Sequence, residues 1–118
     1  MLLSIAELAA QANPNIRTLC ADSAHQECCD NTEAVVIDVR EPHECQQNPV
    51  QGSINIPRGV IEVALPQQIP NPHHPIYLHC ATGMRATLAA EQLIRQGYTQ
   101  ISVIKAPLDA ICKARNAS

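Results

Sequence analysis

Aromatic residues are nearly missing from this chain. It has no phenylalanine and no tryptophan, and only two tyrosines among its 118 residues. Charged residues make up 16% of the chain, whereas hydrophobic residues make up 46%. A core without large rings must be filled by isoleucine, leucine, valine and alanine. The composition and length therefore predict one globular domain over residues 1–118 with an aliphatic core.

An excess of positive charge is also lacking. The formal net charge is −3 at pH 7 and the sequence pI is about 5.9, which argues against binding nucleic acid or anionic membranes through a basic face. No apolar run reaches the length that spans a membrane. The N-terminal stretch lacks the basic segment of a signal peptide and is interrupted by Glu7. We therefore expect a cytoplasmic protein without nucleic-acid or membrane partners.

A zinc-type ligand spacing is missing, although the chain contains six cysteines. These are Cys20, Cys28, Cys29, Cys45, Cys80 and Cys112. The first three crowd one polar segment with His25, but adjacent cysteines rarely both reach one ion, and no second ligand pair follows. In a reducing compartment such thiols stay mostly free despite their even number. We expect no metal and no cofactor, and the sequence leaves open the roles of the five cysteines other than Cys80.

Short β-branched runs alternate with helical patterns along the chain. Strands are expected over residues 16–20, 34–39, 52–57, 76–79 and 101–104. Helices are expected after the Ser4/Glu7 capping box and over residues 40–46, 59–65, 86–96 and 108–114. We expect Pro66 to end the third helix, a turn at 13–15, a surface loop over 21–33, and a stiff connector over 70–75 whose His73 and His74 are solvated. This alternation predicts an α/β fold: a mostly parallel sheet of about five strands, with 34–39 central and helices on both faces.

The segment over residues 76–85 carries the clearest chemical signal. An apolar strand ends on Cys80, and Arg85 follows before a helical pattern. The carboxyl end of a parallel strand borders the crevice where open α/β sheets bind ligands. The start of the next helix directs backbone N–H groups at the sulfur and favours the nucleophilic thiolate. Arg85 adds a planar set of donors for an oxyanion, so the pattern predicts a cysteine that handles anions. The alternative is a buried structural cysteine.

Longer motifs add a family resemblance that covers nearly the whole chain. Residues 36–42 are Val-Ile-Asp-Val-Arg-Glu-Pro, Glu44 follows, and residues 52–57 are Gly-Ser-Ile-Asn-Ile-Pro. With the Cys80 segment and the opening helix, they resemble the rhodanese family of single-domain sulfurtransferases. The resemblance implies a rhodanese-like three-layer fold and a persulfide on Cys80. It also implies that the substrate-binding residues are those that cradle the persulfide and hold an anionic donor, namely Ala81, Thr82, Gly83, Met84 and Arg85.

The chain departs from the family pattern in three places. Asn48-Pro49 stands where the family often has Gly-His, and Cys45 replaces an aromatic residue. Residues 105–108 are Lys-Ala-Pro-Leu, where Gly-Gly and Trp are common. These differences concern packing and pocket walls, and they leave the nucleophile in place.

The expected reaction moves a sulfane sulfur from a thiosulfate-like anion through Cys80 to cyanide or a thiol acceptor, including a thiol of a partner protein. Two alternatives are a sulfur-carrier or partner-binding module with little turnover, and a phosphatase or arsenate-reductase type of enzyme. Relatives acting on phosphate or arsenate carry five residues between cysteine and arginine, whereas this chain has four. A smaller ring of amides suits sulfur better than a phosphoryl group.

The remaining polar residues near the strand ends are expected to be mainly structural. We expect Asp38 and Arg40 to form an ion pair that holds their loop, with Glu44 contributing, although direct contact between Arg40 and substrate is an alternative. His79 precedes Cys80 on a strand and should point to the opposite face. Gly83 is expected to supply a positive φ or a close backbone approach.

Overall fold

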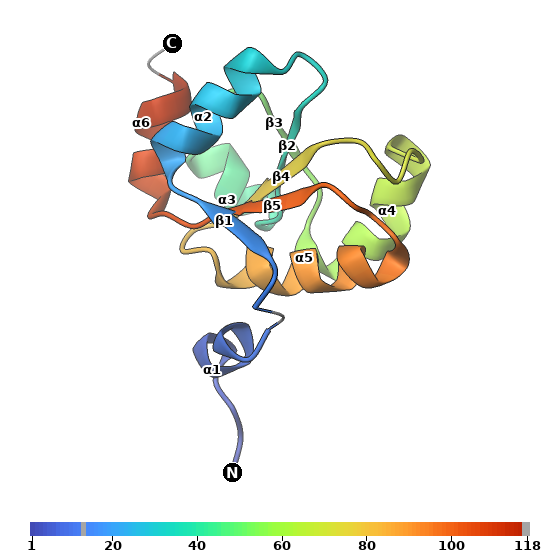
Figure 1. Cartoon of the computed structure of the whole chain (residues 1–118). Coiled ribbons are helices and arrows are strands. Elements are labelled where there is room, and N and C mark those ends of the chain that lie inside the picture. The colour runs from blue at the N-terminus through green and yellow to red at the C-terminus, as the bar shows by residue number, and fades with distance from the viewer. Residues whose placement is uncertain (13, 117–118) are drawn as a thin grey trace.

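Five parallel strands form a single sheet in the computed structural model, which describes residues 1–12 and 14–116 (Figure 1). The strands are β1 (Arg17–Leu19), β2 (Val35–Asp38), β3 (Ser53–Asn55), β4 (Ile76–His79) and β5 (Ile101–Ile104). Their spatial order is β1-β5-β4-β2-β3, and every neighbouring pair is parallel. The predicted α/β fold with about five strands is confirmed. β4 occupies the middle of the sheet. The strand β2 lies next to it and pairs with β4 on one side and with β3 on the other.

Helices cover both faces of this sheet, as predicted. On one face lie α2 (Ala21–Asp30) and α6 (Leu108–Asn116), which pack against each other; on the other lie α5 (Met84–Gln96) and α4 (Ile61–Gln68), preceded by the short helix η1 (Arg58–Val60) (Figure 1). The helix α3 (Pro42–Gln47) follows β2, and α1 (Ile5–Ala10) contacts α5. Among the described residues, no helix has the length and apolar character needed to cross a membrane.

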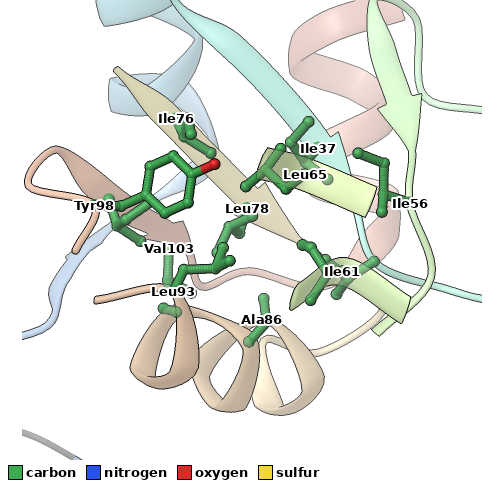
Figure 2. Packing of buried hydrophobic residues seen from close by; sticks show 14 of the residues in the cluster. Ile37, Ile56, Ile61, Leu65, Ile76, Leu78, Ala86, Leu93, Tyr98 and Val103 are labelled. Atoms are coloured by element: carbon green, nitrogen blue, oxygen red, sulfur yellow. The ribbon is translucent and has the colours of Figure 1, made fainter. Parts of the chain in front are cut away.

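The core is mainly aliphatic, as the scarcity of aromatic residues predicts, and the two tyrosines are both part of it. Under α4 and α5, the strand residues Ile37, Leu78 and Val103 pack with Leu65 and Leu93, all fully buried (Figure 2). A second cluster on the opposite face joins the sheet to α2 and α6. It consists of Ala21, Ala24, Val36, Val50, Tyr77, Ile104 and Ile111. Burial of these side chains from water supplies the main favourable free energy of the fold.

The predicted surface loop over residues 21–33 is wrong, because residues 21–30 form the helix α2. This helix buries only two small side chains, Ala21 and Ala24, so its sequence shows little of the apolar stripe that marks a helix. Polar contacts attach it to the sheet instead. Glu27 accepts hydrogen bonds from Arg17 and from the Tyr77 hydroxyl, the latter at 2.7 Å.

The helix α4 continues through Pro66 to Gln68, so the predicted stop at this proline is also wrong. A proline inside a helix lacks the N–H group that would bond to the carbonyl four residues earlier. Here that carbonyl belongs to Glu62, and it accepts a hydrogen bond of 2.9 Å from Gln96 Nε2 on α5. A side chain distant in sequence thus satisfies the acceptor that the proline leaves open.

The predicted boundaries of the other elements need only small corrections. α5 begins at Met84 rather than residue 86, and its most buried face contains Ala86, Ala89, Ala90 and Leu93, whereas Leu88 is half-buried. The capping box of Ser4 and Glu7 is present. In the predicted turn at 13–15, residues 14 and 15 form a turn, and Asn13 lies outside the described residues.

Candidate active site

The candidate site lies at the carboxyl edge of the sheet, where β2, β4 and β5 end side by side. The register pairs Asp38 with His79, and the Val39 N–H donates to the His79 carbonyl at 2.9 Å. Cys80 follows His79 directly, so the residues after β2 and the residues after β4 leave the sheet at the same level. Parallel pairing thus brings together the two motifs that the sequence places about forty residues apart.

Cys80 is 1% exposed, and its sulfur receives a backbone hydrogen bond from the loop that follows. The Gly83 N–H donates to Cys80 Sγ at 3.0 Å. Gly83 has a φ of +100°, which L side chains rarely adopt, and a Cβ there would lie 3.1 Å from Lys105 Cγ. The predicted positive φ is confirmed. The glycine lets the chain turn tightly enough for an amide to face the sulfur just before α5 begins.

The other expected loop residues, Ala81, Thr82 and Met84, differ in their exposure to solvent. Ala81 is half-buried and Thr82 is exposed to solvent. Met84 is the first residue of α5 and is half-buried. A role of these residues in binding substrate stays a prediction.

The guanidinium of Arg85 is held by Glu44 on α3. Arg85 Nη1 lies 2.7 Å from Glu44 Oε1, and Nη2 lies 3.0 Å from Oε2, so both carboxylate oxygens are bound. Glu44 Oε1 also accepts the Glu41 N–H at 3.0 Å. The ion pair with Arg85, followed by this backbone bond, lowers the pKa of Glu44 to about 2.

This contact corrects the expected place of Glu44 in the site. The sequence groups Glu44 with Asp38 and Arg40, but only its backbone carbonyl meets Arg40, at 3.4 Å from Nη1. Its carboxylate instead reaches Arg85, forty-one residues away in sequence. The sequence places an acid in the first turn of α3, but it carries no signal for how that helix is oriented toward α5.

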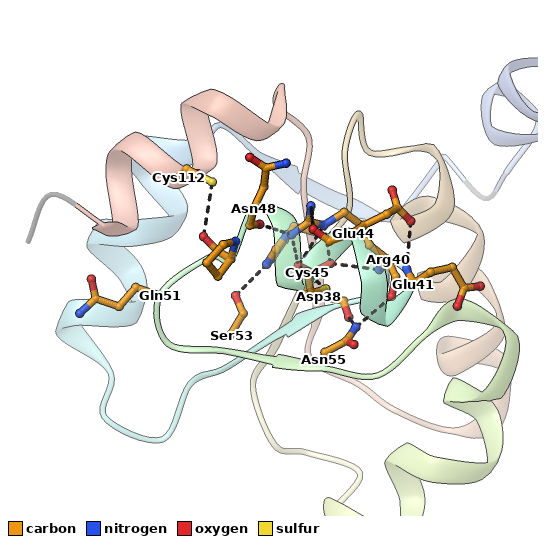
Figure 3. A network of polar contacts seen from close by, with 12 residues as sticks. Asp38, Arg40, Glu41, Glu44, Cys45, Asn48, Gln51, Ser53, Asn55 and Cys112 are labelled. Carbon is orange, nitrogen blue, oxygen red and sulfur yellow. Dashed lines mark hydrogen bonds and ion pairs between the residues drawn. The ribbon is translucent and has the colours of Figure 1, made fainter.

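Asp38 and Arg40 form the predicted ion pair, and it is almost completely buried (Figure 3). Arg40 Nη2 lies 2.7 Å from Asp38 Oδ2 and also donates to the Asn48 carbonyl at 2.8 Å. Burial raises the pKa of Asp38, but the hydrogen bonds from Arg40 and the smaller effect of His79 outweigh it, so the pKa is lowered. The Arg40 side chain thus faces inward and ties α3 to β2.

Cys45 is a member of this network that the sequence did not indicate. Its thiol donates to Asp38 Oδ2 at 3.3 Å (Figure 3). Burial and the Asp38 carboxylate raise the pKa of Cys45 to about 11. The residue that replaces the usual aromatic side chain is therefore a protonated thiol that serves as a hydrogen-bond donor.

His79 is fully buried next to Cys80 in sequence, and its Nε2 lies 2.8 Å from Ser53 Oγ on β3. Burial lowers the pKa of His79 to about 4, against the opposing effect of Asp38. A neutral imidazole bonded across β2 to a side chain of β3 fits the structural role that the alternation of side chains predicts.

We expect acid to weaken the fold through His79. Its imidazole binds a proton near pH 6.5 in the unfolded chain but only near pH 4 in the folded one, so stability is lost as pH falls through this window. The loss should approach about 1.4 kcal/mol per pH unit. Urea denaturation at pH 7, 6 and 5 measures it, and the carboxylates with lowered pKa values contribute little there. A His79→Asn variant should show a flatter dependence; equal slopes would contradict the assignment.

Within the described part of the chain, no group of three or more histidine, cysteine or acidic side chains is arranged to hold a metal ion. All six cysteines are free thiols. Cys29 Sγ and His25 Nε2 lie 3.6 Å apart on α2. In the connector, His73 Nδ1 lies 2.9 Å from Thr99 Oγ1, and His73 is exposed whereas His74 is half-buried.

Comparisons with known proteins find a matching family model and several similar proteins. A family model described as a rhodanese-like domain matches residues 21–114. The thiosulfate sulfurtransferase PspE of Escherichia coli is 35% identical over 65 residues, which cover 55% of this chain and 62% of that protein, less than two thirds of its length. The solved structure of a rhodanese with anions from E. coli has a TM-score of 0.61 and 32% identity, covering 66% of this chain and 91% of that one.

A further solved structure extends the likeness over 97% of this chain and 92% of the matching one. It is a Rhodopseudomonas palustris protein of unknown function described as a possible tyrosine phosphatase, with a TM-score of 0.80 and 25% identity. The names of these similar proteins therefore point to two different activities, sulfur transfer and the hydrolysis of phosphotyrosine.

Proposed function

The chain belongs to the rhodanese-like domain family, and we propose that it is a sulfurtransferase that carries sulfur as a persulfide on Cys80. The observation that carries the proposal is the hydrogen bond from the Gly83 N–H to Cys80 Sγ, 3.0 Å long, at the start of α5. A donor fixed in this position stabilises negative charge on a thiolate and on the outer sulfur of a persulfide. Family membership supplies the sulfur chemistry, and the loop supplies the electrostatic environment for it.

In the first step, the Cys80 thiolate attacks the outer, sulfane sulfur of thiosulfate or a similar anion. A sulfur–sulfur bond forms to Cys80 while the sulfur–sulfur bond of the donor breaks. Sulfite leaves with the bonding electron pair, and the enzyme keeps a persulfide. Arg85 is the residue proposed to bind the oxyanion end of the donor, because its planar guanidinium matches paired oxygens.

In the second step, a nucleophilic acceptor attacks the outer sulfur of the persulfide. The bond to the outer sulfur breaks, and its electron pair returns to Cys80 as thiolate. With cyanide the product is thiocyanate; with a thiolate, of a small molecule or a partner protein, the product is a persulfide. Because Cys80 alternates between two covalent forms, the two substrates should follow ping-pong kinetics.

We propose that residues 1–118 form one domain and that it acts in a reducing compartment such as the cytoplasm. The six free thiols support such a compartment. In this domain Cys80 is the nucleophile, residues 81–85 form the substrate-binding loop, and Asp38 with Arg40 holds the adjoining loop in place.

Phosphate ester hydrolysis is the second candidate, because the Rhodopseudomonas palustris protein is described as a possible tyrosine phosphatase. Loop size favours sulfur transfer. Four residues separate Cys80 from Arg85, and this short loop leaves less room for a tetrahedral phosphoryl group.

The test combines reduced protein, thiosulfate and cyanide, with thiocyanate measured over time and intact mass recorded after donor alone. We expect continuous thiocyanate formation and one added sulfur atom per chain. An added sulfur without turnover would instead indicate a sulfur carrier. Hydrolysis of an aryl phosphate, with no sulfur uptake from thiosulfate or from other persulfide donors, would overturn the proposal.

A further inference from the structure

Two features of the site conflict with simple capture of an anionic donor by Arg85. Both Nη groups of Arg85 are already bound by the Glu44 carboxylate, at 2.7 and 3.0 Å. Cys80 is 1% exposed, so a donor has little access to the sulfur in this arrangement. The site therefore holds an internal carboxylate where an external anion is expected to bind.

Glu44 is fixed in this position by the rest of α3. Its Oε1 accepts the Glu41 N–H, which helps to orient the carboxylate. The backbone of α3 is tied to the buried Arg40, which donates to the carbonyls of Glu44 and Asn48. These contacts restrict the side chain before any ligand arrives, so little conformational entropy is lost in forming the ion pair.

The same guanidinium lies within electrostatic reach of the reactive sulfur. The Glu44 hydrogen bonds raise the pKa of Arg85 most, and smaller contributions come from the charges of Cys80 and Asp38. Glu44 and Arg85 are about 30% exposed, so solvent and incoming ions reach the pair. An anion that approaches Cys80 thus meets Arg85 together with its internal partner.

We propose that Glu44 determines donor specificity by occupying the anion-binding side of Arg85 until a donor with two or more anionic oxygens displaces it. This inference rests on the proposed function and names a substrate class for it. A sulfonate-type end, as in thiosulfate, replaces both contacts of the carboxylate. A neutral persulfide, or an anion that presents one oxygen, leaves Glu44 in place and gains no contact with Arg85.

The near-isosteric Glu44→Gln variant tests this competition. Its amide oxygen can still accept the Glu41 N–H, while the negative charge opposite Arg85 is removed. We expect the KM for thiosulfate to fall roughly fivefold, the range of a partly exposed ion pair, with kcat nearly unchanged. The matched control is Glu33→Gln, which removes one exposed negative charge just before β2, at the opposite edge of the sheet from Cys80, and should leave KM unchanged.

A second readout needs no sulfur transfer. Iodoacetate and iodoacetamide alkylate the same thiol, but only the first carries a carboxylate that Arg85 can bind. Mass spectrometry of the peptide containing Cys80 gives the ratio of the two rates. In Glu44→Gln we expect this ratio to rise roughly fivefold, and in an Arg85→Gln background the same substitution should have no effect on it.

The outcomes separate this inference from the proposed function. A raised alkylation ratio in a protein that transfers no sulfur would keep the role of Glu44 and overturn the sulfurtransferase. An unchanged or lowered ratio, or a KM for thiosulfate that rises in Glu44→Gln, would overturn the role of Glu44. Such a result would show that the carboxylate positions Arg85 for the donor instead of competing with it.

Discussion

Replacing Cys80 with serine should lower thiocyanate formation at least about a thousandfold, to the rate without enzyme. A serine hydroxyl stays protonated near neutral pH and forms no stable equivalent of the persulfide. The donor-treated Cys80→Ser protein should therefore also lack the added sulfur in its intact mass. Because the serine oxygen can accept the Gly83 N–H that the sulfur accepts now, the loop should keep its form. Thiocyanate assays and mass spectrometry on one preparation give both results.

The other thiols provide matched controls for this loss. Cys29 is exposed and Cys112 is half-buried on α6, and serine at either place should keep sulfur transfer within about twofold. Cys45 is a poorer control because its thiol donates to the buried Asp38. Full activity in Cys80→Ser, with loss in one of the other variants, would show that a different cysteine carries the sulfur.

Replacing Arg40 with methionine should reduce the free energy of unfolding by about 3–5 kcal/mol. The change leaves the Asp38 carboxylate buried without its counter-charge, and it removes donors from the carbonyls of Glu44 and Asn48. For a domain of this size the midpoint of thermal unfolding should fall by roughly 15 °C. Thermal and urea denaturation followed by circular dichroism measure both quantities.

Two comparisons show whether burial of the charge is the cause. Arg58 pairs with Glu62 on the surface, and Arg58→Met should cost no more than about 1 kcal/mol. Combining Arg40→Met with Asp38→Leu removes both buried charges and should recover part of the lost stability. Equal losses in Arg40→Met and Arg58→Met would mean that the buried pair contributes no more than a surface one.

The sheet was predictable because its strands carry their own signal. β2, β4 and β5 are short apolar runs, buried on both faces, and such runs are typical of parallel strands. Their order along the chain, with helices between, leaves few other arrangements. The Cys80 loop was predictable for a related reason, since the end of β4 and the start of α5 place Gly83 beside the sulfur.

The predictions from sequence are wrong where contacts between residues distant in sequence decide the local structure. α2 is held by Arg17 and Tyr77 through Glu27, and α4 passes Pro66 because Gln96 bonds to the Glu62 carbonyl. The pairing of Glu44 with Arg85 likewise depends on how α3 is oriented toward α5. In each case the deciding partner lies on another element, so neither propensity nor periodicity could reveal it.

The edge strand β1 limits how far the chain can be truncated from its N-terminus. The family match starts at residue 21, after β1, yet β1 pairs with β5 from Arg17 opposite Ser102 to Leu19 opposite Ile104. A fragment trimmed to the match would leave β5 with one row of unbonded amides and carbonyls, on a strand whose residues are all buried at present. Exposed strands of this kind recruit other chains and aggregate. The smallest fragment that we expect to resist aggregation therefore includes the three residues of β1.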